Sequence, residues 1–431
     1  MLALILTLLV FTTPRGFDAL WREYNSAGTP AGRETAWTLL KSEGWPADYD
    51  STLQRLRARR YPSFVPTGEL HEERVDQEGL HYPYTVLVPK TYDPKRSYPL
   101  RMILHGSTRH SAWRDGVDHW RNKDPFRSAT MITVFPAAWE DAMWWTQRQV
   151  DNLSAILDLL RARYHIDSNR CSLMGLSDGG TGTFYQALRA PSPWACFLPL
   201  IGHPWVLRNE REGVSGDIFA ANLKGRALMV VNGRDDPLYP AKALKPYLDL
   251  FERAGATIDL KVEPGGHSVR WWPQESQTFR EFRAAHSRDP LPDSLVWETD
   301  DPQHNGRCSW VIIESIGNEA APDPDPLNTV LFPDLNPPRR AQAFPRHGPS
   351  GRLSARRQGN TITVTTRNVR RFKLLLGAGE FDFTRPIEVV VDGKSTQRRL
   401  KPSVQSLMKW SIRDGDPELL IAAEIEYKVP H

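Results

Sequence analysis

The chain has 431 residues, which is long enough for one large domain with additions or for two to three domains. Hydrophobic residues make up 40% and charged residues 25%, as in ordinary soluble proteins, and a net charge of +4 is too small to indicate a nucleic-acid partner. The three scattered cysteines form no C-x-x-C spacing and no H-E-x-x-H motif occurs, so neither a disulfide scaffold nor a metal site is expected.

Residues 1–16 form a candidate signal peptide, because residues 1–11 are almost all apolar and too few to span a bilayer. No Lys or Arg precedes the apolar run and no small-x-small cleavage site follows it, so a buried N-terminal strand or helix is the alternative. We therefore expect a secreted or periplasmic protein without a stable membrane span, with a cytoplasmic protein as the alternative.

Residues 17–74 mix charged residues with apolar ones at helical spacing, such as Leu53 and Leu56. Gly44 and Pro46 divide the segment, which predicts several short helices. We expect these helices to pack against the region that follows or to cap it.

Residues 75–290 alternate apolar, strand-like runs with helical patterns, which is typical of an α/β domain with a mostly parallel sheet. Apolar residues recur at helical period from Val150 to Tyr164, and this helix joins the strand-like run 131–135 to the next strand. A crossover helix of this kind makes the two strands parallel.

The run 99–104 reads as a strand and ends in His105-Gly106-Ser107. A strand followed by His-Gly-x is typical of the loop that supplies one backbone N–H to an oxyanion, and Ser107 is the expected donor. His105 is interpreted as structural, because it precedes the candidate nucleophile described next.

A nucleophile elbow is predicted at Gly175-Leu176-Ser177-Asp178-Gly179, which reads G-x-S-x-G. An apolar run, 171–174, precedes it, and a helix-compatible stretch, 181–188, follows it. The glycines permit a strained turn and a close approach of backbones. The helix N-terminus directs N–H groups at negative charge near Ser177, and the N–H of Asp178 is the expected second oxyanion donor.

In this arrangement an acid and then a histidine follow the serine in the chain. The apolar run 227–231 leads to a turn with two carboxylates, and either Asp235 or Asp236 could be the acid. The short strand 258–262 ends in a Gly-rich loop that carries His267. His267 would accept the serine proton, and the aspartate would hold the imidazole in the required tautomer.

Aromatic and histidine side chains near these loops are candidates for a substrate pocket. They form two Trp pairs and a His-x-Trp motif after the strand-like run 197–201, namely Trp144, Trp145, His203, Trp205, Trp271 and Trp272. Ordinary packing is the alternative for the tryptophan pairs, because Trp buries a large area wherever it lies.

Residues 291–431 change character. The tract 321–350 is Pro-rich and is interpreted as a long loop or semi-rigid linker. Period-two patterns follow, for example around Ile362 and Val389, and with the turn Asp392-Gly393 they predict a small antiparallel β domain. Its many arginines indicate a solvated face, with an acidic polymer or an acidic surface as the alternative partner.

These motifs resemble the α/β-hydrolase superfamily of serine hydrolases. The similarity is to secreted feruloyl-esterase-like and polyhydroxyalkanoate-depolymerase-like esterases and to the catalytic domain of prolyl oligopeptidase. The matching stretches are 84–89, 92–94, 104–106, 164–170, 175–180, 233–240 and 266–267. The resemblance implies an α/β-hydrolase fold over about half of the chain. It also favours Asp236 as the acid, through the Gly-x-x-Asp pattern, but it does not fix the substrate.

The sequence therefore predicts a serine hydrolase with an N-terminal helical segment, an α/β-hydrolase domain and a small C-terminal β domain. Because water resolves an acyl-enzyme, no cofactor is expected, and the expected substrate is a small or polymer-borne carboxylic ester. A prolyl-oligopeptidase-like peptidase is one alternative, although no β-propeller repeat precedes the catalytic region. A non-catalytic binding protein on a hydrolase scaffold is the other. The oligomeric state is not predicted.

Overall fold

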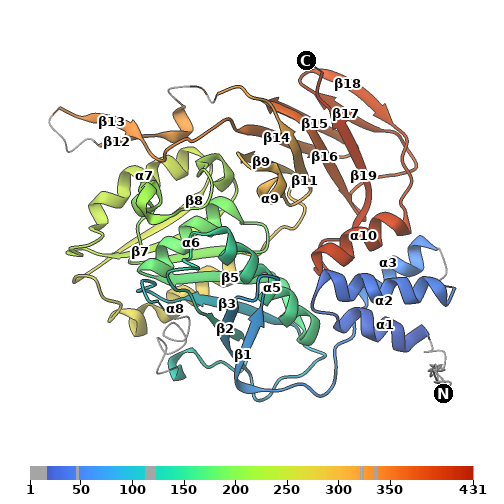
Figure 1. Cartoon of the computed structure of the whole chain (residues 1–431), viewed down its shortest axis with the longest axis horizontal. Coiled ribbons are helices and arrows are strands. Elements are labelled where there is room, and N and C mark those ends of the chain that lie inside the picture. The colour runs from blue at the N-terminus through green and yellow to red at the C-terminus, as the bar shows by residue number, and fades with distance from the viewer. Residues whose placement is uncertain are drawn as a thin grey trace, which may run out of the picture.

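The computed structural model describes residues 17–44, 48–111, 123–320, 322, 325–332 and 337–430. Its largest sheet has eight strands in the order β1-β2-β4-β3-β5-β6-β7-β8 (Figure 1). They are β1 (Gly68–Val75), β2 (His81–Val88), β3 (Tyr98–Leu104), β4 (Ile132–Pro136), β5 (Ile166–Leu176), β6 (Cys196–Leu200), β7 (Ala227–Gly233) and β8 (Thr257–Glu263). β2 pairs antiparallel with β1 and β4, and every pair from β4 to β8 is parallel.

Helices cover both faces of this sheet. Neighbouring strand residues belong to different apolar clusters, as Met102 and Ile103 do, because successive side chains point to opposite faces. α5 (Gln147–Arg163), α6 (Asp178–Arg189) and α7 (Ala241–Arg253) pack on one face, and α8 (Trp272–Ala285) packs on the other. This strand order, with helices on both faces, is the α/β-hydrolase fold that the sequence predicted.

Three N-terminal helices lie on one side of the molecule, as predicted: α1 (Phe17–Ser26), α2 (Pro30–Ser42) and α3 (Tyr49–Arg57). Their apolar cluster includes Leu40 and Leu56, and α10 (Val404–Asp414) near the C-terminus completes it with Leu407, Met408 and Ile412 (Figure 1). The helical segment is shorter than expected, because β1 begins at Gly68. Side chains of β1 are half-buried or exposed, so no apolar run announces this strand. Among the described helices, none is both long and apolar enough to cross a bilayer. Residues 1–16, the candidate signal peptide, lie outside the described residues.

The C-terminal region contains two sheets that share one apolar core. The five-stranded sheet has the order β18-β17-β15-β14-β9, and the four-stranded sheet has the order β10-β11-β16-β19. The strands are β9 (Ser294–Thr299), β10 (Arg307–Cys308), β11 (Val311–Ile316), β14 (Gly351–Gln358), β15 (Thr361–Arg367), β16 (Val369–Gly377), β17 (Ile387–Val391), β18 (Lys394–Arg398) and β19 (Ile421–Lys428). A short helix, α9 (Pro302–Asn305), precedes β10.

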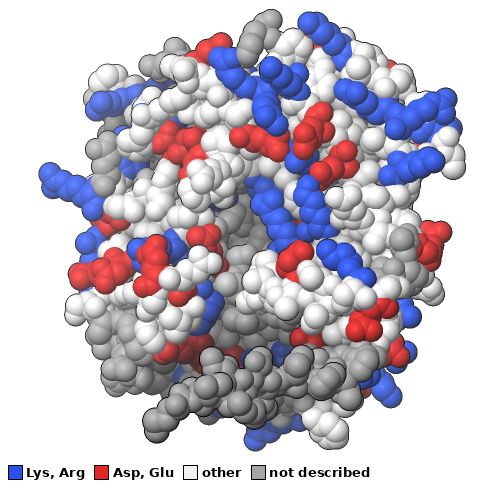
Figure 2. All heavy atoms as spheres, turned by 45° about the vertical axis from the view of Figure 1, so that its right-hand side comes forward, with Lys and Arg blue, Asp and Glu red and all other residues white. Residues whose placement is uncertain are grey.

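The sheets of this region are not purely antiparallel, because β15 pairs parallel with β17. The predicted turn at Asp392-Gly393 does join β17 to β18, and both residues have positive φ, 48° and 81°, as a two-residue hairpin turn requires. Basic and acidic side chains are interspersed on the molecular face shown in Figure 2. The mixture is typical of a solvated surface.

The Pro-rich tract is more than a linker. It contains a hairpin of β12 (Thr329–Phe332) and β13 (Arg339–Gln342). Val330, Ala343 and Phe344 are fully buried in the core of the large sheet, where the hairpin packs beside α7. Short strands with few apolar residues are hidden among the prolines, which explains why the tract reads as irregular.

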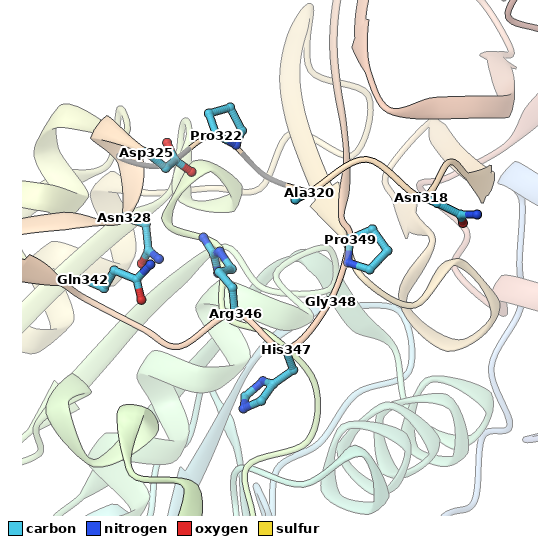
Figure 3. Close-up of a pocket in the computed structure, with 10 residues that line it drawn as sticks. All are labelled: Asn318, Ala320, Pro322, Asp325, Asn328, Gln342, Arg346, His347, Gly348 and Pro349. Carbon is cyan, nitrogen blue, oxygen red and sulfur yellow. The ribbon is translucent and has the colours of Figure 1, made fainter.

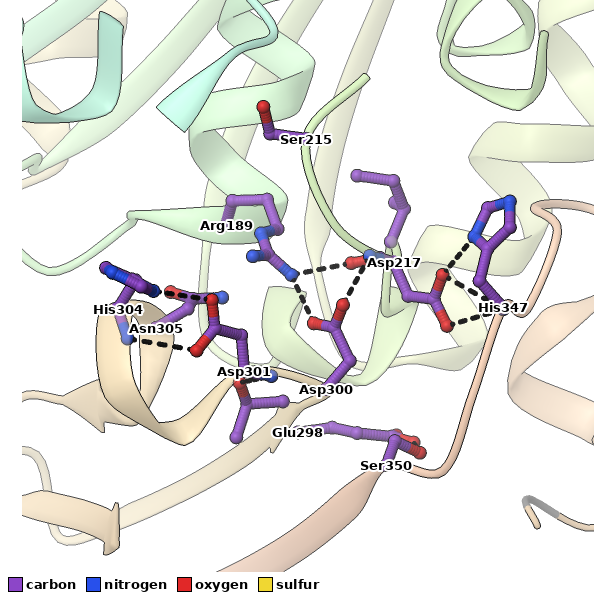
Figure 4. A network of polar contacts seen from close by, with 12 residues as sticks. Arg189, Ser215, Asp217, Glu298, Asp300, Asp301, His304, Asn305, His347 and Ser350 are labelled. Carbon is purple, nitrogen blue, oxygen red and sulfur yellow. Dashed lines mark hydrogen bonds and ion pairs between the residues drawn. The ribbon is translucent and has the colours of Figure 1, made fainter. Parts of the chain in front are cut away.

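A partly buried polar network joins the end of α6 to the C-terminal region (Figure 4). The Arg189 guanidinium lies 2.7 Å from Asp300 Oδ1, and the Asp217 N–H donates to Asp300 Oδ2 at 2.9 Å. His347 Nδ1 lies 2.6 Å from Asp217 Oδ1. Helix α6, which follows the predicted nucleophile, is therefore held at its C-terminal end by residues from beyond the large sheet.

Candidate active site

Ser177 occupies a sharp turn between β5 and α6. Its φ of 54° and ψ of −116° are sparsely populated for a residue with a side chain, and such strain costs on the order of 1–3 kcal/mol. Space is also tight, because a Cβ on Gly179 would lie 2.2 Å from the Leu104 carbonyl oxygen and one on Gly175 would lie 2.0 Å from the Gly179 oxygen. The G-x-S-x-G pattern is thus a steric requirement of this turn.

A chain of hydrogen bonds connects the three predicted triad residues. Ser177 Oγ lies 2.9 Å from His267 Nε2, and His267 Nδ1 lies 2.8 Å from Asp236 Oδ2. Because a carboxylate only accepts, Nδ1 carries the proton and Nε2 offers its lone pair to the serine hydroxyl. This tautomer can accept a proton from Ser177.

The structure brings Asp236 to the histidine and leaves Asp235 outside. Asp236 is only 1% exposed, and its Oδ1 accepts from the N–H groups of Leu238 and Tyr239 at 2.9 and 3.0 Å. Both carboxylate oxygens of Asp236 are therefore used, one for the turn and one for His267. Asp235 is exposed to solvent, so its carboxylate does not take part in this chain of hydrogen bonds.

The two predicted oxyanion donors come from the elbow turn and from the loop after β3. A Cβ on Gly106 would lie 3.0 Å from Ser177 Cβ, so the loop after β3 borders the nucleophile. Ser107 follows in a left-handed conformation with φ of 55°. Within the described residues, neither the N–H of Ser107 nor that of Asp178 has a hydrogen-bond acceptor.

His105 and Trp144 hold this loop through buried hydrogen bonds. His105 is fully buried, its Nε2 accepts from the Ala138 N–H at 2.9 Å, and its protonated Nδ1 lies 2.7 Å from the Gly106 oxygen. The Trp144 indole N–H donates to the His105 oxygen at 2.8 Å. The structural interpretation of His105 agrees with these contacts. Trp144 is fully buried, so it supports the loop and does not form a pocket wall.

The other predicted pocket tryptophans divide into buried and exposed residues. Trp145 is 2% exposed, and its indole donates to the Glu212 oxygen at 2.8 Å, so it is a core residue like Trp144. Trp271 is buried and Trp272 half-buried in the cluster on the α8 face. Trp205 is 52% exposed, which makes it the best placed of these side chains to meet a ligand in solution.

Tyr239, which was not predicted as a site residue, contacts both His203 and His267. The Tyr239 ring meets His267 edge-on at 5.6 Å and lies 6.0 Å from His203. Burial lowers the pKa of His203 to about 4 and raises the pKa of Tyr239 to about 12, so both rings are neutral near pH 7. Tyr239 belongs to the same loop as Asp236, and this proximity in the chain was the available signal.

A cavity of about 340 Å³ lies elsewhere, beside the Pro-rich tract (Figure 3). Asp325, Arg346 and His347 are among its lining residues, and none of the predicted site residues lines it. The Arg346 guanidinium lies 4.3 Å from the centre of the Phe219 ring. Among the residues that the structure describes, no group of three His, Cys, Asp or Glu side chains is placed to hold a metal ion.

Comparisons with known proteins give distant similarities. No family model matches the chain. A bifunctional acetylxylan esterase/xylanase, XynS20E of Neocallimastix patriciarum, is 22% identical over 241 residues, which are 52% of this chain and 33% of that enzyme. The chain therefore spans about a third of the length of this relative.

Similar solved structures include esterases and peptidases. A thermostable esterase is 22% identical with a TM-score of 0.42 and coverage of 51% of this chain and 63% of that one. A ferulic acid esterase is 16% identical with a TM-score of 0.40, and the match covers 51% of this chain and 98% of that one. The Pyrococcus horikoshii acylaminoacyl peptidase is 16% identical with a TM-score of 0.39, and the match covers 51% of this chain and 42% of that one. These TM-scores are low, and the fold assignment rests on the strand order of the large sheet.

Proposed function

We propose that this protein is a serine hydrolase that cleaves a carboxylic ester through an acyl-enzyme. The observation that carries the proposal is the chain of hydrogen bonds from Ser177 through His267 to buried Asp236. A serine hydroxyl becomes a good nucleophile when a neutral, oriented histidine accepts its proton. The elbow turn adds support, because its strain is of the kind that persists at functional sites.

The proposed reaction uses each of these groups in turn. Ser177 Oγ attacks the acyl carbon while its proton passes to His267 Nε2, and Asp236 stabilises the imidazolium. The carbonyl oxygen becomes an oxyanion that accepts from the N–H groups of Ser107 and Asp178. His267 then gives the proton to the departing alcohol, and a water molecule repeats the sequence on the acyl-enzyme.

An ester is proposed over a peptide as the substrate. The curated relative has an acetylxylan esterase in its name, and this supports an ester carried by a polysaccharide or a related small ester. The three reaction groups would serve a peptide equally well, so a peptidase is the second candidate. An acylaminoacyl peptidase is among the solved structures similar to this chain. Export of the protein is part of the proposal and is tested separately by cell fractionation.

The test is a panel of p-nitrophenyl esters and aminoacyl anilides, measured beside labelling with a fluorophosphonate probe. We expect ester turnover and labelling, and both should disappear in folded Ser177→Ala, with kcat lower by about 10⁴ or more. Anilide turnover without ester turnover would establish the peptidase. Labelling that persists in the folded variant would refute Ser177 as the nucleophile, and the absence of labelling and turnover in the wild type would favour a binding protein.

A further inference from the structure

The carboxylate of Asp178 contacts the loop that carries the other oxyanion donor. Its Oδ2 accepts from the Thr108 N–H at 2.8 Å and from the Thr108 hydroxyl at 3.1 Å. Asp178 follows Ser177 directly, and Thr108 follows Ser107 directly. One carboxylate oxygen therefore joins two segments that lie 70 residues apart in the chain, at the two positions where the proposed donors sit.

We propose that Asp178 is a positioning residue, whose carboxylate fixes the distance between the N–H of Ser107 and its own N–H through Thr108. The inference rests on the proposed function, since it concerns the geometry of that oxyanion site. It assigns to the Asp178 side chain a role separate from that of its backbone.

The loop needs such an anchor, because its conformation is not one that its residues favour. Ser107 has a side chain and a φ of 55°, so contacts outside the residue must hold it there. His105 holds the preceding residue through the Gly106 oxygen. Thr108 is fully buried, and its bonds to Asp178 hold the other side of Ser107.

The bond from the Thr108 N–H is the shorter of the two, at 2.8 Å, and the bond from the hydroxyl is longer, at 3.1 Å. Hydrogen bonds to a carboxylate oxygen at the shorter distance are stronger than those between neutral groups. Oxyanion donors act only when they lie at hydrogen-bond distance from the oxygen in the transition state. A loop that relaxes by about 1 Å would lose much of the stabilisation from Ser107. The carboxylate itself repels an oxyanion, so its value lies in geometry and not in charge.

The test compares Asp178→Ala, Asp178→Asn and Thr108→Val with the wild type on one p-nitrophenyl ester. We expect Asp178→Ala to lower kcat by about 10- to 100-fold with KM nearly unchanged, because the lost interaction acts in the transition state. Affinity for a trifluoromethyl ketone, which forms an oxyanion on Ser177, should fall by a similar factor. Asp178→Asn keeps an acceptor oxygen and should recover most of kcat.

Thr108→Val gives an independent measurement, because it removes one hydroxyl, keeps the N–H and preserves side-chain volume. It should lower kcat by a smaller factor than Asp178→Ala. Asp76→Ala is the matched control, since Asp76 Oδ1 accepts from the N–H groups of Glu78 and Leu80, both at 2.9 Å, in the turn between β1 and β2. This variant should keep the wild-type kcat.

The outcomes separate the inference from the proposed function. A wild type without ester turnover and without labelling would overturn both. An active wild type, with Thr108→Val and folded Asp178→Ala within twofold of its kcat and ketone affinity, would overturn the inference alone. If Asp178→Ala does not fold, an unchanged kcat and ketone affinity in Thr108→Val would overturn it by itself.

Discussion

Asp235 and Asp236 are neighbours in the chain and opposites in their surroundings. The structure buries Asp236 against His267 and exposes Asp235 to solvent. We expect Asp236→Asn to lower kcat by about 10⁴, because an amide at this position stabilises the wrong histidine tautomer. Asp235→Asn is the matched control and should stay within about threefold of the wild type, since surface substitutions change little.

The measurement is kcat on one p-nitrophenyl ester, with circular dichroism to show that both variants fold. The reverse ranking of the two variants would move the acid to Asp235. Equal, small effects would remove the acid from the proposed mechanism altogether.

His203 gives a residue-scale prediction about stability and pH. Burial lowers the pKa of His203 to about 4, whereas an unfolded histidine titrates near ~6.5. The unfolded chain thus binds more protons between these values. The stability that neutral His203 contributes is fully present above pH ~6.5 and is lost as the pH falls towards 4.

In the wild type, His203 Nδ1 accepts a hydrogen bond from the backbone N–H of Trp205 at 2.9 Å. The variant His203→Asn removes the titrating group and keeps a side-chain acceptor for this N–H. The free energy of unfolding, measured with urea, should fall between pH 7 and pH 4.5 by about 2 kcal/mol more in the wild type than in His203→Asn. Equal falls in the two proteins would contradict a buried, neutral His203.

The sequence located the residues of the candidate triad because each follows a strand that its apolar residues reveal. Ser177 follows β5, Asp236 follows β7 and His267 follows β8. Contacts between distant loops were not accessible in the same way. Nothing local distinguishes buried Trp144 from exposed Trp205, and no pattern pairs Thr108 with Asp178, because these facts depend on how separate segments meet.

At the scale of elements, the close crossing of β3 and the elbow determines which side chains the turn accepts. A Cβ on Gly179 would lie 2.2 Å from the backbone oxygen of Leu104, where neither partner is a flexible side chain. We therefore expect Gly179→Ala to lower the free energy of unfolding by about 3 kcal/mol and to abolish fluorophosphonate labelling.

Gly348→Ala is the matched control for this prediction, because its Cβ would have nothing within 4 Å. It should keep both stability and labelling, as measured by urea unfolding and by probe incorporation. A Gly179→Ala protein with wild-type stability would show that β3 and the elbow lie farther apart than in the structure.

Strands with continuous apolar runs were the easiest elements to predict from the sequence. All seven residues of β7 are buried, so a parallel, doubly covered strand was evident from composition. No side chain of β1 or β13 is buried, and both strands carry several charges, so they resemble loops. The parallel pairing of β15 with β17 was also hidden, since a period of two gives the face of a strand but not its direction.

At the scale of the whole molecule, buried charges join the C-terminal region to the region of the large sheet. Asp416, before β19, lies 2.7 Å from Arg288 and 3.8 Å from Arg161, and all three side chains are at most 5% exposed. Burial alone would raise the pKa of Asp416, but the two guanidinium groups hold it well below its usual range. Removing one member of such a cluster leaves unpaired buried charge, which costs several kcal/mol.

The Pro-rich tract suggests that the C-terminal region can be removed, and the structure argues against this. A chain that ends at Gly317 keeps β9 and β11 but loses β14 and β16, their neighbours in the two sheets. It also loses α10, which completes the core of the N-terminal helices. We expect this truncated chain to be insoluble, because burying these apolar faces is the main source of stability.

The measurement is the soluble fraction after expression, followed by labelling with the fluorophosphonate probe. A chain that ends at Lys428 keeps every described strand and is the control, which should remain soluble and labelled. A soluble Gly317 truncation with wild-type labelling would contradict the expectation. The buried contacts of Asp416 and α10 would then be dispensable for the large sheet, and the C-terminal region would be a separable domain.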